Sequence, residues 1–327
     1  YTTLNNIQEN SFTFSATQYK TFNIKNKNKL KVKDFLSRDL IRKDLGIGIG
    51  SESYVDNSDY YFMKTAALQE DSNLIDINKE SMQPIIPKNF VKMELKKGDV
   101  LISKDSNVGE IAILEKDYPN IMLCGGIYRL PIKEHKYYLL AFMKNDIFRQ
   151  QIDFLVPRGS TIRHGKTKFL ECFIPIPNYN KEETIKYVEL LMQAIIDKET
   201  IIREKHKKIL EEIEKELKNN QLDNTFKYES PKINNIIKHQ RLDTSLYSKE
   251  FEYNNFIVKN YKYGYVSLTD RGYRGIRGTS LENNFIKSRI DSDEYIEGFY
   301  ELIIPTNISE FGYVKKISYI GTPVELK

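Results

Sequence analysis

Short apolar runs separated by turn residues dominate the chain between about residues 30 and 176. Runs of this length, bounded by Gly, Asn and Asp, are typical of β-strands. They occupy residues 60–63, 100–103, 110–114, 127–132 and 173–176. One helix is predicted among them, over residues 137–154. We therefore predict a strand-rich α+β domain that covers residues 1–177.

A different pattern follows Pro177. No Gly or Pro occurs between Pro177 and Pro231, and apolar residues recur at steps of three and four, as in a coiled-coil helix. We predict a spacer helix over residues 178–220, of which the segment 181–218 makes a rod roughly 57 Å long at 1.5 Å per residue. The predicted helix-pairing stripe consists of Ile185, Val188, Met192, Ile195, Ile202, Ile209 and Ile213.

This stripe implies a partner for the helix. No second helix of comparable length is predicted, so we expect two copies of the chain to pair their helices antiparallel, as a homodimer. Glu199 and His206 fall on the same stripe. Polar residues there penalise slipped alignments, so both are expected to set the register. The alternative is a monomer whose stripe is covered by its own second domain or by another protein.

A polar linker is predicted over residues 221–240, and a second strand-like region over residues 241–327. Two short sequences recur at an offset of about 230 residues: GIGIGS at 46–51 resembles GIRGTS at 275–280, and ELK occurs at both 94–96 and 325–327. Two matches at one offset favour a duplicated domain. The second copy ends early, so it is expected to be a partial domain.

The composition is that of a globular protein. The chain has 327 residues, of which 40% are hydrophobic and 29% are charged, and its net charge is +5. Disorder throughout is excluded, and the length favours two domains. Two cysteines are too few for a disulfide framework, and no zinc-ligand spacing appears. We expect a cytoplasmic protein without metal or cofactor, and the absence of a starting Met suggests part of a longer chain.

The basic residues are concentrated in two patches. Residues 158–170 carry four basic side chains and no acidic one, and residues 271–289 carry five basic side chains against Glu282 alone. The helical segment is nearly neutral despite its many charges. The two patches are therefore better candidates than the helix for binding a polyanion.

An ordered series of motifs carries a family resemblance. The motifs are LKKGDVLIS at 95–103, VGEIA at 108–112, RGST at 158–161, FIPIP at 173–177, GYVSLT at 264–269, EGFY at 297–300 and IGT at 320–322. Together with the long helix, this series resembles the specificity subunit of type I restriction-modification enzymes. The first four motifs are similar to that family's target-recognition domain and its exit into a helical spacer, and the last three to the opening half of another such domain.

The resemblance implies a non-catalytic subunit that reads one half of a split double-stranded DNA target with each recognition domain. It also implies modification methyltransferase subunits as partners, with a restriction subunit as a further one. No methyltransferase or nuclease motif is found in the chain. Two alternatives stay open: the DNA-recognition part of a fused type II restriction-methyltransferase, or a coiled-coil scaffold for protein interactions.

Candidate DNA-binding residues lie in the basic, glycine-bounded loops and at strand ends, where hydroxyl, amide and cationic groups can contact phosphates and base edges. A solvated connecting loop is the alternative interpretation for each, and turn chemistry alone explains the polar residues at 104–107. The candidates are Ser51, Ser53, Tyr54, Lys64, Thr65, Lys104, Asn107, Arg158, Ser160, Thr161, Arg163, His164, Lys166, Arg271, Arg274 and Arg277.

Overall fold

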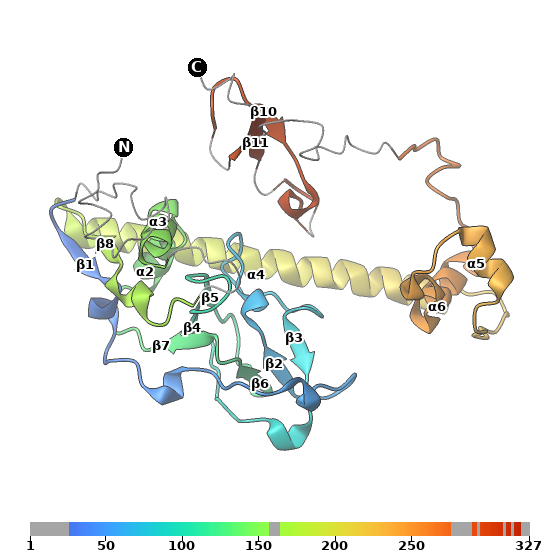
Figure 1. Cartoon of the computed structure of the whole chain (residues 1–327), viewed down its shortest axis with the longest axis horizontal. Coiled ribbons are helices and arrows are strands. Elements are labelled where there is room, and N and C mark those ends of the chain that lie inside the picture. The colour runs from blue at the N-terminus through green and yellow to red at the C-terminus, as the bar shows by residue number, and fades with distance from the viewer. Residues whose placement is uncertain are drawn as a thin grey trace. The chain divides into compact units, whose positions relative to one another are not determined.

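The structure is a computed structural model that describes residues 26–156, 164–275, 290–292, 295–309, 312–314 and 317–321. The chain divides into two compact units, Tyr1–Ile202 and Arg203–Lys327. The boundary lies inside the helix α4, Lys181–Asn219, drawn in yellow in Figure 1. The helix thus begins and ends within three residues of the predicted spacer, but its first half belongs to the first unit.

The described residues of the first unit form three small sheets and two short α-helices, in addition to the first part of α4. One sheet has the order β5-β4-β7, another has the order β3-β2-β6, and β1 pairs with β8. All pairs are antiparallel except β2 with β6. The elements are β1 Lys29–Lys31, β2 Tyr61–Met63, β3 Met82–Pro84, β4 Val100–Ser103, β5 Ile111–Ile113, β6 Ile121–Leu123, β7 Ile127–Leu130, α2 Lys136–Met143, α3 Asp146–Leu155 and β8 Phe173–Pro175.

The predicted α+β class is confirmed, since strands and helices occur in both units (Figure 1). All five predicted strands are present, with ends shifted by at most two residues. The single helix predicted over residues 137–154 is wrong, because the chain forms α2 and α3 there. The side chain of Asn145 accepts a hydrogen bond from the Ile147 backbone nitrogen and so caps a new helix. Strands β1, β3 and β6 were not predicted.

The core of the first unit lies on both faces of β4. Val100 and Ile102 pack with the helices α2 and α3, whereas Leu101 packs with side chains of the β3-β2-β6 sheet such as Met63 and Leu123. Both faces of this strand are therefore buried away from solvent. This explains why β4 reads as an unbroken apolar run rather than as an alternating one.

The first half of α4 completes that core. Ile185, Met192 and Ile196 are buried among the side chains of the first unit, and Val188 packs against them. Ile185, Val188 and Met192 are therefore not available for the predicted helix pairing. The physical reason is that the first unit has an apolar face of its own to cover. The remaining members of the stripe, which are Ile195, Ile202, Ile209 and Ile213, are exposed.

The second unit contains the helices α5, Ile233–His239, and α6, Lys249–Lys259, and a sheet of order β10-β11-β9. Its strands are β9 Ile290–Ser292, β10 Tyr300–Leu302 and β11 Ser318–Gly321. The predicted linker over residues 221–240 is not a plain linker. It contains α5, and the buried side chain of Asn260 donates hydrogen bonds to Gln221 Oε1 and to the Leu222 carbonyl.

The sheet of the second unit repeats the topology of part of the first. In the first unit β2 pairs antiparallel with β3, and Ile85, directly after β3, forms an antiparallel bridge with Tyr54. In the second unit β10 pairs antiparallel with β11, which pairs antiparallel with β9. A 3-10 turn follows the first strand of each hairpin, at Thr65–Ala67 and at Pro305–Asn307.

The registers also correspond. Tyr61 pairs with Pro84 as Tyr300 pairs with Ile320, and the next residues, Ile85 and Gly321, pair with Tyr54 and Ile290. This agreement supports the duplication predicted from the sequence. The second copies of the repeated sequences lie almost wholly outside the described residues, at 276–280 and 325–327.

Candidate nucleic-acid interface

Lys64 and Tyr54 come together at the end of β2. The Lys64 Nζ atom lies 5.5 Å from the centre of the Tyr54 ring and donates a hydrogen bond to Gln83 Oε1 at 3.3 Å. The Lys64 backbone nitrogen donates to the Ser81 carbonyl at 2.8 Å. The backbone is thus fixed where the strand ends, and the cation lies over an aromatic face.

Lys104 follows β4 and is held between two other segments. Its backbone nitrogen donates to the Gly126 carbonyl at 2.8 Å, and its carbonyl accepts from the Gly165 nitrogen at 2.7 Å. The turn between β6 and β7 and the segment that begins at His164 therefore flank the end of β4. This places three predicted sites, Lys104, His164 and Lys166, beside one another.

A carboxylate joins two of these side chains. Asp105 Oδ2 forms an ion pair with Lys104 Nζ, and Asp105 Oδ1 lies 2.8 Å from Nδ1 of His164. The side chains of Lys104 and Asp105 are only 18% and 19% exposed, whereas that of His164 is 64% exposed. Asp105 was not among the predicted residues, since in the sequence it reads as an ordinary turn aspartate.

Gly126 lies close to the ends of both strands, β2 and β4. A Cβ atom at Gly126 would lie 2.7 Å from Thr65 Cγ2 and 3.5 Å from the Asp105 Cβ atom. Gly126 thus lies near both Thr65 and Asp105, and a side chain at this position would force Thr65 to shift. We use the name basic edge for the set Tyr54, Lys64, Thr65, Lys104, Asp105, His164 and Lys166.

Two predicted sites have structural roles instead. The hydroxyl of Ser53 is buried and accepts a hydrogen bond from Asn89 Nδ2 at 2.7 Å. Asn107 Nδ2 donates to the carbonyl oxygens of Thr65, at 3.0 Å, and Leu68, at 2.6 Å. Asn107 thus holds the backbone of a loop about 40 residues away in the sequence. Ser51, by contrast, is exposed at the start of a 3-10 turn.

Other predicted sites lie elsewhere. Arg271 and Arg274 are exposed in the second unit, in a turn where the Arg271 nitrogen donates to the Ser267 carbonyl. The predicted residues outside the described parts of the chain are Arg158, Ser160, Thr161, Arg163 and Arg277.

A partly buried charge network supports the loop that follows Thr65–Ala67. Arg149 forms ion pairs with Glu110 and Glu70, and Lys144 Nζ donates to the Gln69 carbonyl at 2.7 Å. Burial lowers the pKa of Lys144 to about 8, and burial raises the pKa of Glu110 against the opposing effect of Arg149. The network ties this loop to α2, α3 and β5.

Two cavities lie away from the basic edge residues. A cavity of about 630 Å³ in the first unit has Leu45, Ile47 and Leu123 among its lining residues, with Lys43 and Arg129 also lining it. None of the predicted DNA-binding residues lines this cavity.

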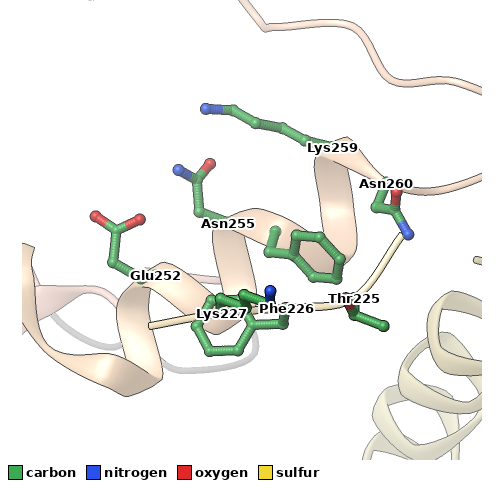
Figure 2. Close-up of a pocket in the computed structure, with 8 residues that line it drawn as sticks. Thr225, Phe226, Lys227, Glu252, Asn255, Lys259 and Asn260 are labelled. Carbon is green, nitrogen blue, oxygen red and sulfur yellow. The ribbon is translucent and has the colours of Figure 1, made fainter. Parts of the chain in front are cut away.

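The second cavity, of about 480 Å³, lies in the second unit between α6 and residues 225–227 (Figure 2). The rings of Phe226 and Phe256, 5.5 Å apart, and the side chains of Glu252, Asn255 and Lys259 line it. None of the predicted DNA-binding residues lines this cavity either.

Within the described residues, no group of three or more His, Cys, Asp or Glu side chains is arranged to hold a metal ion. No helix in the same part of the chain is long and apolar enough to cross a membrane. Burial raises the pKa of the Cys124 thiol, which lies next to the basic edge.

No protein-family model matches the chain, and no curated protein matches it. Among solved structures, the chain is similar to the HsdS subunit from Thermoanaerobacter tengcongensis, with 15% identity, a TM-score of 0.33 and coverage of 54% of this chain and 39% of that one. It is also similar to the type I restriction-modification S subunit from M. genitalium, with 15% identity, a TM-score of 0.33 and coverage of 61% and 44%.

A third similar chain comes from a structure that concerns complex assembly and conformational transition of the type I R-M system. Here the identity is 16%, the TM-score is 0.31, and the match covers 56% of this chain and 43% of that one. The chain thus spans less than half the length of each of these three neighbours.

Proposed function

We propose that this chain is a sequence-specific, non-catalytic DNA-binding specificity subunit of a restriction-modification system. It reads double-stranded DNA with its first unit and positions an adenine methyltransferase subunit, with a restriction subunit as a further partner. The observation that carries the proposal is the basic edge. Segments far apart in the sequence, at residues 54–65, 104–105 and 164–166, contribute its side chains.

The chemistry of the basic edge suits a DNA duplex. Lysine side chains neutralise phosphates, and a hydroxyl or imidazole can contact a base edge. The rigid placement of Lys64 and Lys104 by backbone hydrogen bonds gives such contacts a defined spacing. The segment directly before His164 adds Arg158 and Arg163 by sequence. An edge that combines fixed lysine side chains with an aromatic ring can bind the DNA phosphates and also contact the base edges that lie between them.

A split DNA target requires two recognition units, which the pairing of two chains would supply. We propose that two copies associate through the exposed part of α4, so that each contributes its first unit to a symmetric, divided site. Ile195, Ile202, Ile209 and Ile213 are the apolar side chains that this pairing would cover. The same exposed side chains favour the second candidate function, a coiled-coil scaffold that binds protein and not DNA. The first function, DNA recognition, would also fit a chain that is the recognition part of a fused type II restriction-methyltransferase.

A salt titration tests the proposal. The full chain, with its methyltransferase partner present, is titrated with a pool of randomised DNA duplexes and with duplexes enriched from that pool by repeated selection. We expect affinity to fall steeply with salt, by about 0.9 in the logarithmic slope for each phosphate contacted, and selection to enrich a shared motif. A chain that binds neither probe at low salt is not a DNA-recognition subunit, and the scaffold function then takes its place.

A further inference from the structure

We propose that Asp105 is a specificity-determining residue of the basic edge: its carboxylate occupies Lys104 and His164 until a matching DNA site replaces it. The inference rests on the proposed function and adds a mechanism that weakens binding to random DNA. It assigns an active role to an acidic residue at the centre of a cationic surface.

The geometry shows a carboxylate with both oxygens engaged. One oxygen pairs with Lys104 Nζ and the other lies 2.8 Å from His164 Nδ1. The backbone of Lys104 is fixed on both sides, by Gly126 and Gly165. Asp105 also lies beside Gly126, whose built Cβ atom would be 3.5 Å from the Asp105 Cβ atom. The pair is therefore preset and does not depend on two mobile surface side chains meeting by chance.

Burial makes this ion pair different from an ordinary one. The side chains of Lys104 and Asp105 are less than one fifth exposed, whereas those of Lys96 and Asp117, an ion pair on the same unit, are 65% and 53% exposed. Charges that are mostly shielded from water attract each other more strongly than charges in bulk solvent. Lys104 consequently offers little attraction to a passing phosphate while Asp105 holds it.

The exchange of partners is what gives selectivity. A phosphate that reaches Lys104 must displace the Asp105 carboxylate and then lies close to a like charge, which penalises every duplex equally. A matching site compensates for this penalty by presenting a base amino group, such as cytosine N4, as a donor to the released carboxylate. Random duplexes lack that donor in the right place and gain nothing from Lys104.

The test compares two isosteric substitutions, Asp105→Asn and Asp117→Asn. Both remove one negative charge and leave the size of the side chain unchanged, but only the first frees Lys104. Binding of the full chain with its methyltransferase partner is measured against the randomised duplex pool and the enriched duplexes. For Asp105→Asn we expect tighter binding to the pool, a logarithmic salt slope steeper by about 0.9, and a smaller ratio of enriched to random affinity.

One additional phosphate contact also means that affinity for the pool falls about threefold more between low and moderate salt. Asp117→Asn should keep the slope and the affinity ratio of the parent. The double variant Lys104→Gln, Asp105→Asn should lose the steeper slope, because Lys104 is the cation that the first substitution releases. Thermal unfolding of each variant checks that the first unit stays folded.

Several outcomes overturn the inference. If Asp105→Asn matches Asp117→Asn in slope and ratio, the carboxylate has no role in selection. If Asp105→Asn weakens binding to both probes, Asp105 holds side chains that bind DNA and does not restrain them. If the double variant retains the steeper slope, another cation causes it. A parent chain that binds neither probe refutes the proposed function itself, which is a separate result.

Discussion

The carboxylate of Glu199 accepts hydrogen bonds from both nitrogens of Asn73, the backbone one and the side-chain one, each at 3.1 Å. The Ser72 hydroxyl donates to the same carboxylate at 2.8 Å. Glu199 lies on α4, and the loop at 72–73 follows the 3-10 turn Thr65–Ala67 of the basic edge. The helix thus fastens a loop that leads directly to the candidate DNA-binding residues.

This relationship corrects the expectation that Glu199 sets the register of a helix pair. Its carboxylate is already used within the first unit, because the loop backbone at Asn73 needs an acceptor that the loop itself does not supply. The expected role of His206 in register stays a prediction.

Replacing Glu199 by Ala should lower the free energy of unfolding of the first unit by about 2 to 3 kcal/mol, since hydrogen bonds to a charged group are lost and loop donors are left without an acceptor. The matched control is Glu211→Ala, because Glu211 is exposed and pairs only at 3.6 Å with Lys207 among the ion pairs described. That change should cost less than about 0.5 kcal/mol. Urea denaturation measures both, and equal effects would contradict the fastening role.

The lowered pKa of Lys144 predicts that the free energy of unfolding rises at alkaline pH. Burial lowers its pKa in the folded chain to about 8, from an ordinary value of 10.5. Between these two values the unfolded chain binds more protons than the folded chain, so the free energy of unfolding rises with pH. In Lys144→Met this contribution is absent. We expect the difference in unfolding free energy between parent and variant to shift in favour of the parent from pH 8 to pH 10.

Urea denaturation at a series of pH values measures this difference, in which other titrating groups largely cancel. A Lys144→Gln variant keeps a donor for the Gln69 carbonyl without the charge, and it should also lack the pH-dependent contribution. A difference that stays constant over this range would show that Lys144 titrates like an exposed lysine.

Lys64→Ala should weaken binding to random duplexes and lower the logarithmic salt slope by about 0.9, the effect of losing one phosphate contact. Lys116 provides the control, because its Nζ atom lies 5.2 Å from the centre of the Tyr118 ring, much as Lys64 lies over Tyr54 at 5.5 Å. Lys116→Ala should leave the slope unchanged. If both substitutions act alike, the effect is one of net charge and the position of Lys64 on the basic edge is irrelevant.

The exposed half of α4 predicts self-association. Sedimentation equilibrium at micromolar protein concentration should give about twice the chain mass of 38.4 kDa. Ile209→Asp should reduce this to the monomer mass without loss of stability, because Ile209 is 57% exposed within the single chain. Ile185→Asp should instead unfold the first unit, since that side chain is buried. A parent that sediments as a monomer would rule out the helix pair.

Local patterns predicted the elements of this protein. The apolar runs predicted the strands β2, β4, β5, β7 and β8, and the absence of Gly and Pro after Pro177 predicted α4 to within three residues at each end. Strand and helix periodicities are properties of neighbouring residues, so they can be read along the chain. The offset of the repeated sequences also indicated a second copy, and the corresponding strand pairings in the two units support it.

Only the tertiary structure decided which polar side chains are free to bind. Ser53, Asn107 and Glu199 look like exposed polar residues in the sequence, yet each satisfies a buried or loop partner from a distant segment. Asp105 looks like a turn residue, yet it joins Lys104 to His164, which lies 59 positions away. A polar residue has no preference for a particular partner until the fold brings one within hydrogen-bonding distance, and that distance depends on contacts between segments remote in sequence.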